Sequence, residues 1–220
     1  MSGARGGGGP EPERLAARIR DEAARAGIPA PGPALADRLG ELLARLYRWN
    51  ARINLTAIRD PDEGVRRHVV ESLFALGRIP PDARGTLCDL GSGNGFPALP
   101  LLLAREGLEG VLFERVARKV DFLRAAIGGL GLAGRVTVRE ENLSSPENLP
   151  PDCRWVTLRA FPDPEEWIAG IVRHRPEVTV LAWLDAEAAR AVSSACRHSG
   201  KKAESLPLPT RPGGVLLVVR

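Results

Sequence analysis

Leucines recur at helical spacing in the first third of the chain. They predict an amphipathic helix over residues 34–49, because residues three and four apart share one face of a helix. The leucines of this stripe are Leu35, Leu39, Leu42, Leu43 and Leu46. An alanine-rich charged segment predicts a helix over 11–26, and a third helix is expected over 61–76, where Asp60 precedes a proline and suits the N-cap. Together these segments predict a helical extension over residues 11–80.

The pattern changes after residue 80, where short apolar runs alternate with helix-like segments. The predicted strands are 86–90, 110–114, 135–139, 155–159, 178–184, 203–207 and 214–219, and the predicted helices are 97–106, 117–130, 164–174 and 186–199. Such alternation predicts a mostly parallel sheet with helices on both faces. The last two strands have only a short connection, so they are expected to form an antiparallel hairpin. The expected fold class is α/β, with a seven-stranded domain over residues 81–220.

Composition is that of an ordinary globular protein, with 44% hydrophobic and 26% charged residues. No apolar run approaches the ~18 residues of a membrane span, and the N-terminus lacks the apolar core of a secretory signal. We therefore expect no membrane association and a cytoplasmic location. Residues 1–10 include a run of glycines and are expected to form a disordered tail.

The three cysteines, Cys88, Cys153 and Cys196, lie far apart and form no Cys-x-x-Cys pair. Neither a disulfide framework nor a zinc site is indicated, so we expect no metal and a reducing compartment. Cys88 lies in the first predicted strand and is expected to be buried. The net charge of +4 is compatible with a nucleic-acid partner and does not require one.

A glycine-rich loop follows the first predicted strand of the domain. The chain reads Thr-Leu-Cys-Asp-Leu-Gly-Ser-Gly-Asn-Gly-Phe over residues 86–96, so Asp89 precedes the alternate glycines Gly91, Gly93 and Gly95. Glycine has no Cβ and tolerates positive φ, which lets the backbone approach a ligand closely. This is the place in the sequence where local geometry indicates a cofactor.

Three kinds of glycine loop compete for this segment, beside a plain turn without a ligand. A phosphate-binding P-loop requires a Gly-Lys pair, and no lysine precedes Lys119. A dinucleotide loop requires a third glycine where the chain has Phe96. The remaining pattern, Asp-x-Gly-x-Gly-x-Gly, resembles the first motif of class I S-adenosylmethionine (SAM) methyltransferases.

A second acid strengthens this interpretation. Glu114 ends the next predicted strand, and in nucleotide-binding α/β folds an acid about 20 residues beyond the loop commonly binds ribose hydroxyls. A carboxylate suits this role because it accepts hydrogen bonds from both hydroxyls of a diol. Asp89, the glycines and Glu114 together favour an adenosyl cofactor, with SAM expected.

Several segments resemble one family. They are Trp49-Asn50-Ala-Arg-Ile-Asn54-Leu55-Thr56, Arg59-Asp60-Pro61, Arg67-His68-Val-Val-Glu-Ser, Asp89-Leu-Gly-Ser-Gly-Asn-Gly-Phe-Pro97 and Arg118-Lys119-Val-Asp-Phe122-Leu123-Arg124. This run resembles the RsmG (GidB) family of bacterial small-subunit rRNA methyltransferases over roughly residues 40–160. The resemblance implies a Rossmann-like class I fold and SAM-dependent methylation of N7 of one guanine in 16S rRNA. The implied partner is 16S rRNA or an assembly intermediate of the small ribosomal subunit.

The resemblance also implies roles for individual residues. The implied cofactor-binding residues are Asp89, Gly91, Ser92, Gly93, Gly95, Phe96, Glu114, Asn142, Leu143 and Arg159. The residues implied to act on the substrate guanine or its phosphates are Arg159, Arg118, Lys119 and His68. For His68, packing is the alternative to substrate contact. For Asn54, closing the junction after its helix is the alternative to lining the cofactor site.

The chain departs from the family pattern at several positions. Ala98 replaces a usual glycine, Leu158 a serine and Glu141 an arginine, and a lysine common after the fifth strand is missing where Leu184 and Asp185 stand. Two alternative functions follow: a SAM methyltransferase for another RNA or a small molecule, and a non-catalytic relative that binds SAM or RNA.

Overall fold

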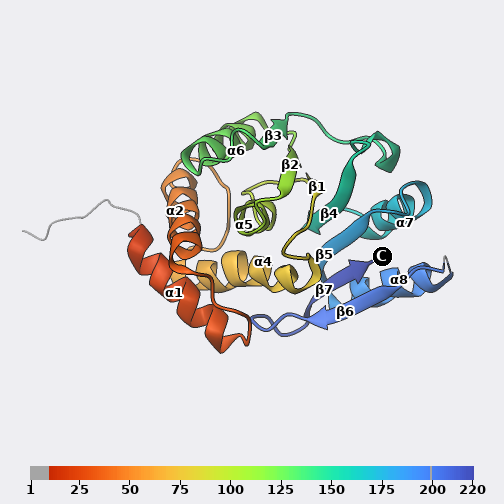
Figure 1. Cartoon of the computed structure of the whole chain (residues 1–220), viewed down its shortest axis with the longest axis horizontal. Coiled ribbons are helices and arrows are strands. Elements are labelled where there is room, and N and C mark those ends of the chain that lie inside the picture. Colours follow the sequence, from red (N-terminus) through yellow and green to blue (C-terminus); the bar gives the residue numbers. More distant parts are fainter. Residues whose placement is uncertain (1–9, 199) are drawn as a thin grey trace, which may run out of the picture.

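A computed structural model describes residues 10–198 and 200–220, and its centre is a seven-stranded sheet (Figure 1). The strands are β1 (Gly85–Leu90), β2 (Leu108–Phe113), β3 (Val136–Arg139), β4 (Cys153–Arg159), β5 (Thr179–Asp185), β6 (Ala203–Pro207) and β7 (Gly214–Val219). Their order is β3-β2-β1-β4-β5-β7-β6, and only β7 is antiparallel to its neighbours. The predicted sheet and its closing hairpin are confirmed, with small differences at the strand ends.

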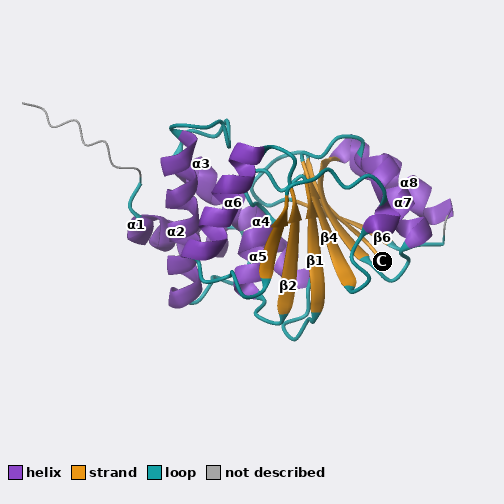
Figure 2. Cartoon of the chain, turned by 90° about the horizontal axis from the view of Figure 1, so that it is seen from above, coloured by secondary structure: helices purple, strands orange, loops and turns teal. Residues whose placement is uncertain are grey.

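Helices cover both faces of this sheet, as predicted. Figure 2 shows α7 and α8 on one side, and α1, α2, α4, α5 and α6 on the other. The helices are α1 (Pro12–Arg25), α2 (Pro33–Asn50), α3 (Pro61–Gly64), the π-helical η1 (Val65–Val70), α4 (Glu71–Phe74), the 3₁₀ segments η2 (Ala75–Arg78) and η3 (Pro146–Asn148), α5 (Ala98–Ala104), α6 (Ala117–Gly129), α7 (Pro164–His174) and α8 (Ala186–His198). Residues 1–9 of the predicted tail, and residue 199 of the last predicted helix, lie outside the described residues.

Alternate side chains of the central strands enter two separate apolar cores, because neighbouring residues of a strand point to opposite faces of the sheet. Leu87 of β1 is fully buried among the N-terminal helices, α5 and α6. Cys88, the next residue, is buried with α7 and α8, as the sequence predicts. The helical extension thus packs into the same core as one face of the sheet. The domain boundary at residue 80 stays a prediction.

The segment over 61–78 begins as predicted but is not a uniform α-helix. Asp60 caps it, because its carboxylate accepts hydrogen bonds from the amides of Asp62 (3.1 Å) and Glu63 (3.3 Å). The expected single α-helix is wrong in its interior, where η1 is π-helical. The spacing of apolar residues does not distinguish an α-helix from a short π-helix, since both bury residues at similar intervals along the chain. Short π-helical stretches occur frequently at functional sites.

Asn50, the last residue of α2, holds the connection that follows this helix. Its Oδ1 accepts hydrogen bonds from the amides of Leu55 (2.8 Å) and Thr56 (3.0 Å), and its Nδ2 donates to the carbonyl of Thr56 (3.0 Å). Asn50 is buried, whereas Asn54, the residue for which the sequence offered this role, is exposed. The junction is therefore closed by the other asparagine of the same motif.

Replacing Asn50 by alanine is expected to lower the free energy of unfolding by about 2–4 kcal/mol, because buried backbone groups lose their partners. Asn54→Ala is the matched control and should change stability by less than about 0.5 kcal/mol, since it lies at the surface. Denaturant unfolding of both variants measures the difference. Equal effects of the two substitutions would contradict the assignment.

His68 packs beneath this connection. Its Nε2 lies 3.0 Å from Oγ1 of Thr56, and its ring lies against that of Phe96, with 5.1 Å between the centroids. Nδ1 of His68 is buried and has no hydrogen-bond partner within the described part of the chain. Burial, with the charges of Arg159 and Arg67, lowers the pKa of His68 to about 3, so the ring is neutral at physiological pH.

This lowered pKa makes stability depend on pH in a definite direction. The unfolded chain binds a proton on His68 near pH 6.5, whereas the folded chain resists it, so stability is lost as the pH falls below 6.5. The quantity to follow is the difference between the free energies of unfolding of the native chain and of His68→Gln. We expect this difference to fall by about 2 kcal/mol between pH 7.5 and pH 5. Subtracting the variant removes the contribution of other titrating groups. A constant difference across this range would show that the ring accepts a proton in place.

Candidate active site

Two cavities lie side by side at the carboxyl edge of the sheet. The first cavity has a volume of about 460 Å³ and lies beyond the ends of β1 and β2. The second has a volume of about 450 Å³ and lies beyond the ends of β4 and β5. Strand order reverses between β1 and β4, and ligands of open α/β sheets bind at such a switch point. Both volumes are in the range of small-molecule sites.

The glycine loop forms one side of the first cavity. Gly91, Gly93 and Gly95 have φ values of 68°, 52° and 80°, a region that other residues rarely adopt. A Cβ on Gly95 would also lie 2.6 Å from Cδ1 of Leu99, so glycine is needed there for space as well. Ser92 is buried and donates from Oγ to the carbonyl of Asp89 (3.1 Å). The predicted loop is therefore a backbone conformation that only this pattern of glycines permits.

Glu114 anchors this loop to the end of β2. Its Oε2 accepts a hydrogen bond from the amide of Gly93 (2.9 Å), and its Oε1 accepts one from the amide of Val116 (2.8 Å). The side chain is buried and lines the first cavity. A carboxylate has about four acceptor sites, so about two remain free. Glu114 can thus hold the loop and also accept hydrogen bonds from a diol.

Asp89 carries a buried carboxylate oxygen without a partner. Its Oδ1 accepts a 2.5 Å hydrogen bond from Oγ1 of Thr157, the residue beside it on β4. Its Oδ2 has no hydrogen-bond partner among residues 10–198 and 200–220. Burial raises the pKa of Asp89 to about 6. An unpaired buried carboxylate beside a glycine loop fits the ammonium group of a cofactor, which would supply the missing positive partner.

The other residues predicted for the cofactor or the substrate are divided between the first cavity and other positions. Asn142 and Leu143 line the first cavity, as does Lys119 near the start of α6. Arg118 is exposed on the same helix. Phe96 is buried against His68, and neither ring lines the first or the second cavity. Contact of Phe96 with cofactor and of His68 with substrate stays a prediction.

Phe161 lies between the two cavities and lines both. A Cβ on Gly91 would meet its ring at 3.1 Å, so the ring lies directly over the glycine loop. Its other contact is edge-on with Trp167, at 5.6 Å between centroids. Ala160 and Asp163, on either side of Phe161, have positive φ values of 50° and 48°. Such backbone costs of order 1–3 kcal/mol per residue and occurs mainly where function requires it.

Arg159 ends β4 and belongs to the second cavity. Its Nη2 donates to Oε2 of Glu71 (2.9 Å) and to the carbonyl of Arg67 (2.7 Å). Burial lowers the pKa of Arg159 to about 10, which leaves it cationic at physiological pH. The family resemblance implies a role for Arg159 but none for its fully buried partner Glu71, although Glu71 is the glutamate of the Arg67-His68-Val-Val-Glu-Ser segment.

The two acids that replace basic family residues have local partners. Glu141 lines the first cavity and lies 3.7 Å from Nη1 of Arg139. Asp185 caps α8, where its Oδ1 accepts hydrogen bonds from the amides of Glu187 (3.0 Å) and Ala188 (2.9 Å). At residue 185 the acid thus serves a helix N-terminus, a role that a lysine could not fill.

Sequence reasoning missed Glu71, Phe161 and Arg211 as residues of this edge. Phe161 follows the predicted Arg159 closely, so the loop after the fourth strand was a usable signal. Arg211 lies in the connection before β7 and lines the second cavity. No local pattern connects it with residues more than a hundred positions earlier.

Among the residues that the structure describes, no helix combines the length and apolar character needed to cross a bilayer. The same residues contain no cluster of histidine, cysteine, aspartate or glutamate suited to a metal ion.

Comparison with solved structures shows the fold. The structure superimposes with a TM-score of 0.54 on the precorrin-6y C5,15-methyltransferase of Geobacter metallireducens GS-15, at 16% identity over 68% of this chain and 86% of that one. For an O-methyltransferase family protein of Burkholderia thailandensis the TM-score is 0.50, at 14% identity over 84% and 71%. The fold is therefore the Rossmann-like fold of class I methyltransferases.

Sequence comparison shows the family. The family described as "GidB: rRNA small subunit methyltransferase G" matches residues 36–207. The chain is 39% identical over 204 residues to the ribosomal RNA small subunit methyltransferase G of Myxococcus xanthus, covering 87% of this chain and 92% of that protein. It is 42% identical over 180 residues to the enzyme of the same name from Anaeromyxobacter sp., covering 81% of each. The chain belongs to the rRNA small subunit methyltransferase G (GidB) family.

Proposed function

We propose that this chain transfers a methyl group from SAM to N7 of a guanine in 16S rRNA. The observation that carries the proposal is the first cavity, which Gly91 and Glu114 line, together with the unpaired buried carboxylate oxygen of Asp89, two residues before Gly91 in the chain. Family membership supports a small-subunit rRNA as the acceptor. The proposed partner is 16S rRNA or an assembling small subunit, and the proposed location is the cytoplasm.

The residues that line the first cavity suit SAM, as does Asp89, which precedes the glycine loop without lining the cavity itself. Asp89 would bind the ammonium group, and Glu114 would accept hydrogen bonds from the ribose hydroxyls. Leu143, which is buried, would pack against the adenine, and Asn142 lies at the rim. SAM supplies an electrophilic methyl group when it is bound. The protein therefore needs only to bind SAM and the acceptor, to orient them toward each other and to exclude water.

Methylation at N7 requires little acid–base catalysis from the residues of this chain. Guanine N7 carries a free lone pair and needs no deprotonation. The main requirement is therefore that N7 be aligned with the methyl group of SAM. Arg159 would align the acceptor; this is supported by its position in the second cavity, which shares Phe161 with the first. A guanidinium group can donate hydrogen bonds to O6 of guanine or to a phosphate, which leaves the N7 lone pair free to attack the methyl group.

The chemical test is methyl transfer to 16S rRNA from a strain that lacks this modification. With the pure protein and SAM, N7-methylguanosine is expected in the nucleoside digest. Glu114→Ala should weaken binding of S-adenosylhomocysteine about tenfold or more, because an acceptor of the ribose hydroxyls is lost. Arg159→Ala should spare that binding and lower methyl transfer. Glu109→Ala and Arg154→Ala are matched controls, since both residues are exposed on the same strands.

Failure to form N7-methylguanosine, with cofactor binding intact, would refute the rRNA assignment and leave another acceptor or a non-catalytic role. Absence of any binding of S-adenosylhomocysteine by calorimetry would refute each SAM-dependent function.

Binding of the cofactor is also expected to depend on pH through Asp89. Its pKa is raised to about 6 in the free protein, and the ammonium group of S-adenosylhomocysteine requires the ionised carboxylate. Affinity is therefore lost as the pH falls through 6, and the dissociation constant should be about tenfold higher at pH 5 than at pH 7. Calorimetry across this range measures it. Asp89→Asn should bind weakly at pH 7 and lose the dependence; if the variant retains the same slope, another group is responsible.

A further inference from the structure

Three arginines from distant parts of the chain meet in the second cavity. Arg67 comes from η1, Arg159 from the end of β4, and Arg211 from the connection between β6 and β7. All three line the cavity and are partly or largely buried, with side chains 30%, 15% and 30% exposed. A single fully buried carboxylate, that of Glu71, lies among them.

In this geometry Glu71 forms a hydrogen bond with only one of the three guanidinium groups. Its Oε2 accepts from Nη2 of Arg159 (2.9 Å), and its Oε1 accepts from Oγ1 of Thr210 (3.0 Å). Nε of Arg67 and Nε of Arg211 lie 3.2 Å and 3.9 Å from Oε1 without forming hydrogen bonds.

Three buried nitrogens are therefore left over. They are Arg67 Nε, Arg159 Nη1 and Arg211 Nε, and none has a hydrogen-bond partner within residues 10–198 and 200–220. A buried donor without an acceptor is costly and uncommon in a folded protein. Three such donors around one cavity indicate that the acceptor belongs to a ligand.

The other acids nearby do not supply that acceptor. Glu63 lies 3.6 Å from Nη1 of Arg67 and is 42% exposed, so it is at the surface. Asp185 lines the cavity but binds the N-terminus of α8 through Oδ1. The buried group of three arginines and Glu71 retains a positive charge, so an anion is the ligand that it favours.

We propose that this arginine cluster, Arg67, Arg159 and Arg211, binds a backbone phosphate of the RNA strand that carries the acceptor guanine. The proposal rests on the function proposed above and adds the subsite that positions the substrate. Phosphate oxygens accept several hydrogen bonds at once, and arginine is the side chain best matched to them. The cluster lines the second cavity, which shares Phe161 with the first cavity. A bound phosphate would therefore lie next to the site of methyl transfer. Contacts to phosphate fix the register of a nucleic acid on a protein.

Arg211 is the residue through which the cluster can be tested without disturbing its buried centre. Its guanidinium group lies across the Cα of Gly214: a Cβ there would be 2.4 Å from Nε and 3.0 Å from Cζ. Gly214 begins β7 and is not among the glycines with positive φ, so its backbone tolerates alanine. Gly214→Ala should therefore displace Arg211 while leaving every charge in place.

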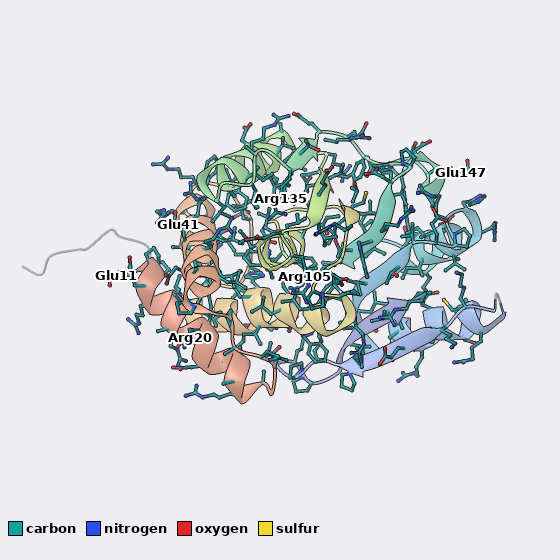
Figure 3. The ribbon with its side chains drawn as sticks, viewed as in Figure 1. Glu11, Arg20, Glu41, Arg105, Arg135 and Glu147 are labelled. Atoms are coloured by element: carbon teal, nitrogen blue, oxygen red, sulfur yellow. The ribbon has the colours of Figure 1, made fainter. Side chains whose placement is uncertain are left out.

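The first experiment is a titration of the native chain with inorganic phosphate at low salt, followed by calorimetry. Arg211→Gln and Gly214→Ala should each weaken phosphate binding about tenfold, because they remove or displace a charged donor. Arg20→Gln is the matched control, since Arg20 is exposed on α1, at the side of the molecule away from α7 and α8 (Figure 3). All variants should bind S-adenosylhomocysteine as the native chain does, which shows that they are folded. Equal phosphate affinity in all four proteins, or no binding to the native chain, would overturn the proposal.

The second experiment measures methyl transfer to 16S rRNA as a function of salt. Arg211→Gln and Gly214→Ala should raise KM about tenfold and leave kcat nearly unchanged, because the contact positions the RNA and does not touch the reacting atoms. The slope of log(kcat/KM) against log salt should become shallower by about one in Arg211→Gln. An unchanged KM and slope would refute the phosphate subsite. If phosphate binding follows the expected pattern but no rRNA is methylated, the anion site stands and the proposed acceptor fails.

Discussion

The side chain of Glu71 has no exposed surface, and a buried carboxylate is stable only where cations and hydrogen-bond donors surround it. This requirement connects segments that are remote in sequence. Arg159 reaches Glu71 from β4 and Thr210 from the connection before β7, and Nε1 of Trp183 on β5 donates to its backbone carbonyl (3.0 Å). The helical segment over 61–78 is thereby fixed to the carboxyl edge of the sheet. The walls of the second cavity follow from that attachment.

Three acids at this edge are handled in different ways. Glu114 accepts hydrogen bonds from two backbone amides, so it holds the glycine loop in shape. Glu71 is held by arginines and a threonine. Asp89 has one hydroxyl partner and one bare oxygen, and the pKa of its carboxyl is raised accordingly. Asp89 is thus the one of these three acids with a carboxylate oxygen that has no hydrogen-bond partner among the described residues.

The sequence was most informative where local chemistry dictates geometry. Short apolar runs between helix-like segments predicted the strands, and the glycines at 91, 93 and 95 predicted a loop that requires positive φ. It was least informative where partners come from distant segments. The pairing of Arg159 with Glu71, 88 positions apart, depends on how η1 lies against the sheet, which no local pattern records. Likewise, Asn50 and not Asn54 closes the connection after α2, because Asn50 is the asparagine that points inward at the end of this helix.

The position of β7 has a consequence for the order in which the molecule can form. In the sheet, β7 lies between β5 and β6, so β6 has no neighbour in the sheet until the strand after it has been made. On a chain growing from the ribosome, β6 emerges before β7, and its backbone groups have no partner strand until β7 has been made. The connection that carries Thr210 and Arg211 reaches Glu71 only when β7 enters the gap. The part of this edge that holds the second cavity is therefore completed late in synthesis, after β1 and the glycine loop that follows it are already available.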